Sequence, residues 1–171
     1  MPKKVYNNVE SYKMFDGADT VEDVTSVSLP TIEHPTTEIK AAGMAGDIDM
    51  PNLLHINSMS YSIAHNNGLN SHLLPLPRRH EQELRIARQV YDVNGAEIGY
   101  ESVKCRFVGV HVKTEKGSVE SGNPMGSTED YSCLRYEEEV NGTVRMLVDI
   151  MANKIVFNGV DYTNDINQFL E

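Results

Sequence analysis

Residues 131–150 of the chain read YSCLRYEEEVNGTVRMLVDI. The second half of this stretch has apolar residues at every other position: Val144, Met146, Val148 and Ile150. Such a period of two is typical of a half-buried β-strand. Because both central residues of a type I′ turn need positive φ, the pair Asn141-Gly142 between two such runs indicates a β-hairpin. We therefore expect strands over 131–140 and from residue 144 onwards, joined by a tight turn.

Alternation of the same kind recurs elsewhere along the chain. We expect further strands at 24–29, 59–63, 103–112 and 155–157. Residues 81–92 carry enough charge for an amphipathic helix. Leu84, Ile86 and Val90 would nevertheless share one face of a strand. Because Val93-Asn94-Gly95 then supplies a turn, we expect a strand there as well.

Residues 67–74 are the best candidate for a short helix, because Asn66 or Asn67 could cap its start and Pro75 would end it. Residues 117–130 hold three Gly, three Ser and one Pro without an apolar pattern, so we expect a loop. Many short strands with one short helix predict a mainly β protein, a β-barrel or sandwich. Residues 1–171 are expected to form a single domain.

The charge balance narrows the functional classes. The 171 residues include 25 Asp and Glu against 15 Lys and Arg, a formal net charge of −10. Binding of DNA by counterion release needs a basic face, and adsorption to an anionic membrane needs clusters of Lys and Arg, so we expect neither of the monomer. Two cysteines are too few for a disulfide framework. The start of the chain does not resemble a signal peptide, and we expect a soluble intracellular protein.

No motif in the chain predicts catalysis. The six histidines lack the spacing of a zinc site, and Cys105 and Cys133 lie in strand-like apolar runs that favour burial. Residues 43–46 are glycine-rich like a phosphate loop but lack its Lys-Ser/Thr ending. Asp47 and Asp49 would repel an anion there. We expect no enzymatic activity, no metal and no cofactor.

Glu137, Glu138 and Glu139 form the densest acidic run in the chain. Under strict alternation, Glu137 and Glu139 share a strand face with Cys133 and Arg135, and Glu138 lies on the other face. Alternation cannot bury both faces, so at least one of them meets solvent. Both a solvated sheet edge and the wall of a water-filled lumen satisfy this pattern.

The order of several segments is similar to that of a known family. These segments are YKMFDG at 12–17, VSLP at 27–30, AGMAGDID at 42–49, NGTV at 141–144 and VDIMANKIVFNGVD at 148–161. Their succession resembles the major tail tube proteins of contractile-tailed bacteriophages and of the related phage-tail-like bacteriocins. The similarity is clearest over 12–49 and 131–161, and over 64–125 only the general pattern matches.

The resemblance implies a β-barrel-like protomer that forms a hexameric ring, with rings stacked into a rigid tube inside a contractile sheath. It implies a structural role without enzymatic activity. The implied partners are other copies of the chain, a sheath protein, and baseplate or initiator proteins. DNA would be met only in transit through the lumen. The implied location is the bacterial cytoplasm during assembly and then the virion or a phage-tail-like particle.

Extended loops near 40–52 and 117–130 are the expected assembly elements. The residues of the first that would reach a neighbouring subunit are Gly43, Met44, Ala45, Gly46, Asp47, Ile48, Asp49 and Met50. Strand alternation suggests the following acidic residues of the lumen: Glu97, Glu101, Glu137, Glu139 and Asp149. Acidic side chains there would repel phosphates and keep DNA from adhering to the wall. The alternative is a monomeric acidic β-barrel that binds a ligand or a partner protein.

Overall fold

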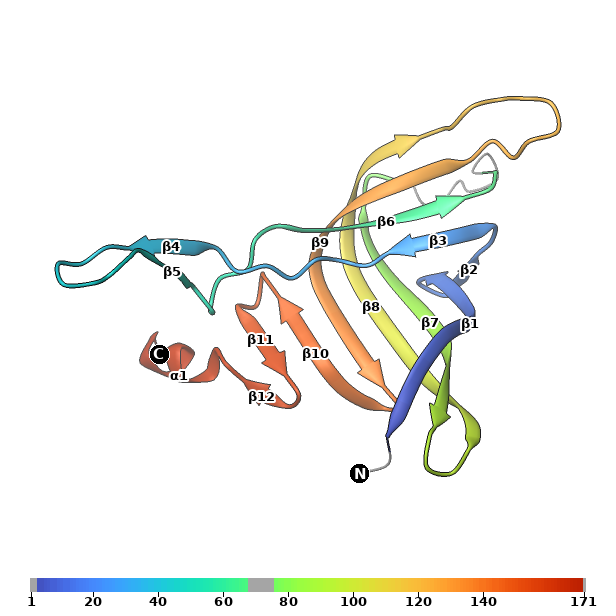
Figure 1. Ribbon diagram of the computed structural model, residues 1–171. Helices are drawn as coiled ribbons and strands as arrows, with labels where there is room; N and C mark the ends of the chain where they lie inside the picture. The colour runs from blue at the N-terminus through green and yellow to red at the C-terminus, as the bar shows by residue number, and fades with distance from the viewer. Residues whose placement is uncertain (1–2, 68–75, 171) are drawn as a thin grey trace.

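The computed structural model describes residues 3–67 and 76–170 (Figure 1). In this part of the chain strands dominate, and one short helix lies near the C-terminal end. The first strands are β1 (Lys4–Asp16), β2 (Asp19–Val21), β3 (Val24–Ser28), β4 (Thr36–Ile39), β5 (Ile48–Pro51) and β6 (Met59–His65). The remaining elements are β7 (Arg79–Asp92), β8 (Glu97–Glu115), β9 (Ser127–Val140), β10 (Thr143–Asp149), β11 (Lys154–Phe157), β12 (Val160–Asp161) and helix α1 (Asn164–Leu170). The predicted fold class, mainly β with one short helix, is confirmed.

One sheet contains ten of these strands. Its order is β12-β11-β10-β9-β8-β7-β1-β2, with β6 and β3 attached beside β9. β7 to β12 are consecutive along both the chain and the sheet, so this half of the fold is an antiparallel meander. One edge of β9 serves two partners, because β6 pairs with its first half and β10 with its second half. β4 and β5 form a separate two-stranded hairpin.

The sheet is strongly curled (Figure 1). The core inside the curl is rich in aromatic and sulfur-containing side chains. The ring of Tyr61 on β6 stacks on Tyr131 of β9 and on Phe107 of β8, with centroid distances of 4.9 and 4.6 Å. Met14 from β1 and Leu84 from β7 complete this layer at 1% and 3% exposure. The alternating apolar residues of five strands therefore meet inside the curl, and the hydrophobic effect holds the curvature.

Polar side chains are buried beside this core. Asp16 on β1 lies opposite Gln82 on β7, and Gln82 Nε2 donates to Asp16 Oδ2 at 3.3 Å. His80 Nδ1 lies 2.7 Å from the same carboxylate oxygen, and the Tyr61 hydroxyl donates to Gln82 Oε1 at 2.7 Å. A one-residue slip of β1 against β7 would break these buried contacts, so they fix the strand register.

The curled sheet does not close into a barrel. Its two ends approach each other at β1 and β3, where the Tyr12 hydroxyl donates to the backbone oxygen of Val24 at 3.2 Å. β2 pairs only with residues 14–16 of β1, so the longer first part of β1 has a free edge among the described residues. The protomer is thus a curled but open sheet, and the first part of β1 is one of the unpaired edges among its described residues.

The hairpin at the centre of the decisive sequence stretch is confirmed. Asn141 and Gly142 have φ angles of 49° and 81°, and Thr143 pairs with Val140 across the turn. The segment 81–92 lies in β7, so the strand prediction there is also confirmed. The expected helix at 67–74 lies outside the described residues, apart from Asn67, which is not helical. Helix α1 follows β12 and was not predicted.

A bulge at Leu134 changes which residues of β9 share a face. Successive pairs with β8 at Cys133 and Arg135 leave Leu134 without a partner on that strand. Cys133 is buried at 1% exposure whereas the Arg135 side chain is 42% exposed, because the bulge places them on opposite faces. The prediction that Glu137 and Glu139 share a face with Cys133 is therefore wrong. They share a face with Arg135.

Both segments expected to be loops contain strand residues. β5 covers Ile48–Pro51, so the first segment is the end of a β-hairpin whose turn spans residues 40–47. β9 starts at Ser127, so the second loop covers only residues 116–126, and the expectation of a loop over 127–130 is wrong. Gly117 closes the base of this loop at φ 76°, where a Cβ would lie 1.5 Å from the backbone oxygen of Gly126.

Candidate assembly surfaces and a charged sheet face

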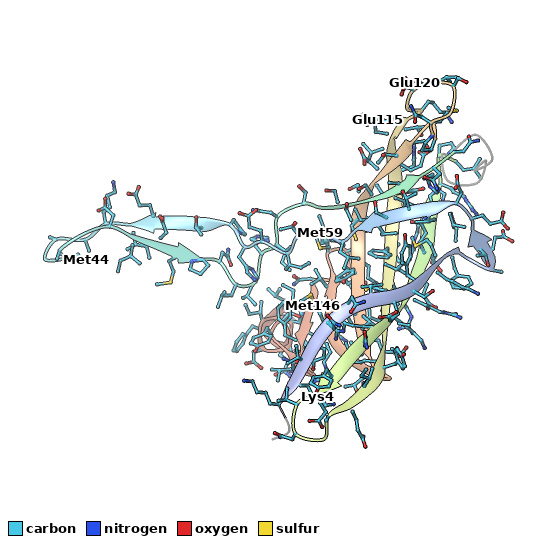
Figure 2. All side chains as sticks on the ribbon, turned by 45° about the vertical axis from the view of Figure 1, so that its right-hand side comes forward. Lys4, Met44, Met59, Glu115, Glu120 and Met146 are labelled. Carbon is cyan, nitrogen blue, oxygen red and sulfur yellow. The ribbon has the colours of Figure 1, made fainter. Side chains whose placement is uncertain are left out.

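The hairpin of β4 and β5 is an arm that extends away from the sheet, and Met44 lies at its far end (Figure 2). We call residues 36–51 the arm. Every residue of both strands is exposed, including Ile39, Ile48 and Met50 at 42%, 48% and 51%. A two-stranded hairpin without a covering layer is marginally stable in water. The arm therefore gains stability from any surface that covers it.

The two faces of the arm differ in chemistry. Cross-strand pairs place Thr37 beside Met50 and Ile39 beside Ile48, so one face is apolar apart from the threonine. The other face carries Glu38 directly opposite Asp49. Opposed like charges destabilise a strand pair, and Lys40 offsets part of this repulsion through its contact with Glu38 at 2.9 Å. The arm is an amphipathic ribbon with one apolar side and one acidic side.

Two further apolar surfaces lie at other places on the molecule. At the tip of β7 and β8, Val5, Tyr91 and Ile98 are successive cross-strand partners, exposed at 45%, 39% and 60%. Helix α1 buries none of its residues, and Phe169 and Leu170 are 86% and 77% exposed. Clusters of exposed apolar side chains on more than one side are typical of a chain that is covered by other chains.

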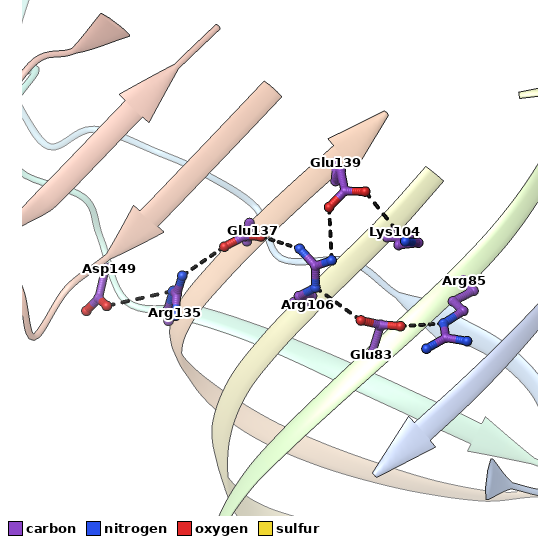
Figure 3. Close-up of polar contacts among 8 residues, drawn as sticks. All are labelled: Glu83, Arg85, Lys104, Arg106, Arg135, Glu137, Glu139 and Asp149. Atoms are coloured by element: carbon purple, nitrogen blue, oxygen red, sulfur yellow. Dashed lines mark hydrogen bonds and ion pairs between the residues drawn. The ribbon is translucent and has the colours of Figure 1, made fainter. Parts of the chain in front are cut away.

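A continuous set of ion pairs crosses β7, β8, β9 and β10 on the face of the sheet opposite the core (Figure 3). We call this set the ladder. Its members are Glu83, Arg85, Lys104, Arg106, Arg135, Glu137, Glu139 and Asp149. Arg106 is its centre, because Nε contacts Glu83 at 3.1 Å, one terminal nitrogen contacts Glu137, and the other contacts Glu139 at 2.9 Å. Arg135 extends the set from Glu137 to Asp149.

The ladder is electrically balanced, since its four cations match its four carboxylates. The cationic side chains are 36–58% exposed, whereas the carboxylates are 13–23% exposed. The guanidinium and ammonium groups thus form the outer layer and the carboxylates lie beneath them. The hydrogen bond from Arg106 lowers the pKa of Glu139, so this carboxylate stays ionised and continues to balance the cations.

The predicted lumen residues do not share one face. Glu137, Glu139 and Asp149 belong to the ladder. Glu101 pairs with Arg88, which is its cross-strand partner on the core side of the sheet, and Glu97 is exposed at the tip of β8. Four of the five carboxylates are therefore paired with a cation rather than free.

Sequence reasoning placed Arg135 on the face of Glu137 and Glu139 but missed its ion pairs and the other cations of the ladder. Arg106 and Arg135 each lie on the strand next to that of their partner, and only the register brings them opposite Glu137 and Asp149. The one available signal was alternation itself, since Arg106 alternates with the apolar Cys105 and Phe107 in β8. Once strands β8 and β9 are paired through their long hairpin, this pattern places Arg106 on the acidic face.

The described residues include no group of three His, Cys, Asp or Glu side chains arranged to hold a metal ion. Burial raises the pKa of the Cys133 thiol to about 12, so this sulfur stays protonated near neutral pH and is a poor nucleophile. No helix in residues 3–67 or 76–170 is long and apolar enough to cross a membrane.

An open sheet with a free edge, an amphipathic arm and apolar surfaces on several sides defines a structural protein that is completed by association with other chains. A family model described as phage tail tube protein FII matches residues 7–170. The chain belongs to this family of tail tube proteins, which are structural components of the virion and assemble into a tube. Comparison with curated proteins gives no match.

Proposed function

We propose that the protein forms hexameric rings that stack into the inner tube of a contractile tail. On contraction of the sheath, the tube is driven through the envelope of the target cell, and in a phage it then conducts DNA. Its partners are other copies of itself, the sheath protein, and baseplate or initiator proteins. Assembly takes place in the bacterial cytoplasm before the tube becomes part of the virion or of a phage-tail-like particle.

The observation that carries this proposal is the amphipathic arm. Its apolar face has no covering layer among the described residues, and Ile39, Ile48 and Met50 are half exposed. The tip of β7 and β8 and helix α1 present other apolar surfaces. Association between unlike surfaces of identical copies is heterologous, and such contacts close into a ring or continue as a stack.

The free edge of β1 supports the same arrangement. A long edge strand with unpaired backbone groups is a template for pairing with another chain. Within a ring, pairing of this edge with a strand of the neighbouring copy would satisfy those groups. The arm (residues 43–50 in particular) and the loop at 116–126 would then contact the neighbouring subunit or the next ring.

Electron microscopy of the purified protein in negative stain tests the proposal directly. We expect rings or hollow rods, and size-exclusion chromatography should show species much larger than 19.1 kDa. Deletion of residues 43–46 should leave a folded subunit that does not polymerise. A stable monomer under all assembly conditions would support the alternative, an acidic β protein that binds a ligand or partner, and would refute the tube.

A further inference from the structure

We propose that the ladder face lines the hollow of the tube and presents DNA with a charge-balanced wall instead of an acidic one. This inference rests on the proposed function, because it needs a ring with a central hole. An acidic lumen would repel the phosphates of DNA. On a charge-balanced wall, the attraction of each cation for a phosphate is cancelled by the repulsion from the carboxylate beside it.

The curl of the sheet decides which face can border a hole. The inner side is filled by its own core, in which Tyr61, Phe107 and Tyr131 are at most 2% exposed. β6 and β3 lie on that side and contribute Ile63 and Val27 to the core cluster. Of the two sides of the sheet, the outer one is therefore the side that can border a hole in a ring.

The chemistry of the outer face distinguishes the part that would line the hole from the part that would contact another copy. Along β7 and β8 this face changes from the charged ladder at residues 83–85 and 104–106 to the apolar tip at Tyr91, Ile98 and Tyr100. Cores of protein interfaces are depleted in charged residues, so the apolar end fits a contact between copies and the ladder does not. The ladder cations already have carboxylate partners within the same chain, so a neighbouring protein is not needed to pair them.

The exposure of the charged side chains determines which of them DNA in the lumen would contact first. The side chains of Arg106 and Arg135 are 37% and 42% exposed, while that of Glu137, which both contact, is 13% exposed. Phosphates would approach guanidinium groups whose charge is compensated from below at hydrogen-bond distance. Release of counterions, which drives DNA onto basic surfaces, requires uncompensated cations. The net charge of −10 comes from other parts of the chain, because the ladder sums to zero.

Site-specific labelling of assembled tubes tests where the ladder face lies. Ser102→Cys places a thiol on this face of β8, and the control Ser26→Cys places one at an exposed position of β3, outside the ladder face. The two native cysteines are buried and give little background. Each variant is treated with a small maleimide and with a maleimide on a polymer too bulky to enter the tube, before and after assembly.

We expect Ser102→Cys tubes to lose labelling by the bulky reagent while they still react with the small one. Ser26→Cys tubes should react with both. Equal labelling of both variants by the bulky reagent would place the ladder on the outside, and protection of Ser102→Cys from both reagents would bury it between copies. Either result overturns the proposal even though tubes have formed, whereas failure of the wild-type protein to form tubes contradicts the proposed function instead.

A charge variant tests the balance itself. Glu137→Gln with Glu139→Gln leaves four cations and two carboxylates in the ladder, which is two uncompensated positive charges per copy. Tubes of this variant should retain a short DNA oligonucleotide that added salt releases, and wild-type tubes should not. The control Glu22→Gln with Glu33→Gln makes the same change of charge at exposed positions outside the ladder and should behave as wild type. Equal retention by wild-type, control and variant tubes would overturn the balanced wall.

Discussion

The ring of Tyr61 lies parallel to that of its cross-strand partner Tyr131, with centroids 4.9 Å apart and an interplanar angle of 6°. This pair joins β6 to β9 and brings the Tyr61 hydroxyl to the buried side chain of Gln82 on β7. One aromatic residue thus connects two strands that are far apart in the order of the sheet. This buried hydrogen bond spans the interior of the curl and links β6 to β7.

Removal of the Tyr61 hydroxyl should destabilise the subunit. In Tyr61→Phe the stacking remains but Gln82 Oε1 loses a buried donor, which costs about 1–3 kcal/mol. Urea unfolding of the unassembled subunit should show a lower midpoint with an unchanged slope. Tyr100→Phe is the matched control, because that side chain is 72% exposed. Equal midpoints for the two variants would show that the buried hydrogen bond contributes nothing.

Gly109 allows β6 to approach β8. A Cβ at this position would lie 2.7 Å from the Tyr61 hydroxyl oxygen and 2.9 Å from the backbone oxygen of Ser132. Because the backbone cannot yield easily, Gly109→Ala should lower the free energy of unfolding by roughly 1–3 kcal/mol. Gly99→Ala in the same strand meets nothing closer than 3.9 Å and should be close to neutral. Thermal unfolding of both variants measures the difference, and a stable Gly109→Ala protein would contradict this account of the packing.

The two faces of the arm should contribute unequally to assembly. Ile39→Thr with Ile48→Thr keeps β-propensity but removes apolar contacts worth about 1.5–3 kcal/mol for each fully buried isoleucine. We expect an unchanged midpoint of unfolding and a critical concentration for tube formation that rises about tenfold or more.

The control changes the opposite face of the same strands. Glu38→Thr with Asp49→Thr removes two opposed carboxylates and should assemble at least as well as the wild type. Sedimentation over a concentration series measures both variants. If the two double variants assemble equally well, the apolar face is not the contact surface.

The folded subunit should lose stability in alkaline solution. Burial raises the pKa of the Cys133 thiol from 9.0 to about 12. Between these two pKa values the folded protein keeps the thiol proton, whereas the unfolded chain releases it. The resulting stability is fully present below pH 9 and is lost as the pH rises towards 12. Urea unfolding between pH 8 and pH 10.5 should show this decline, and Cys133→Ala should show a shallower one.

Burial also predicts that both thiols of the native subunit react slowly with thiol reagents. At pH 8 a thiol-specific reagent should modify Cys105 and Cys133 only after unfolding. Rapid reaction of either thiol in the native subunit would contradict the buried positions of both sulfur atoms.

Periodicity predicted the central part of the fold because each strand of the meander pairs with its neighbour in sequence. The Asn141-Gly142 turn and β7 follow directly from local pattern and turn chemistry. Alternation failed at Leu134, since a bulge inserts one residue where the edge partner of β9 changes from β6 to β10. No local signal marks that position, because the bulge arises from contacts between distant strands.

Local sequence pattern was likewise insufficient to predict the arm and the ladder in full. The arm was recognised from its glycine and apolar residues, but its strands were not, since β4 contains only four residues. Strand alternation singled out Glu137, Glu139 and Asp149 and placed Arg135 on the face of the two glutamates, but it did not single out Glu83. The contacts of Arg106 with Glu137 and of Arg135 with Asp149 follow only from the register, which sets ionic contacts across strands.

The order of strands in the sheet has a consequence for the timing of folding. β7 to β12 pair with neighbours in sequence, whereas β1 pairs with β7 and β6 pairs with β9, across much longer separations. Local pairings form faster than distant ones. During synthesis at roughly 5–20 residues per second, β1 and β6 emerge before their partners β7 and β9 exist. We therefore expect the C-terminal strands, which are synthesised last, to fold first. The assembly surfaces of a nascent subunit are then complete only after its whole chain has left the ribosome.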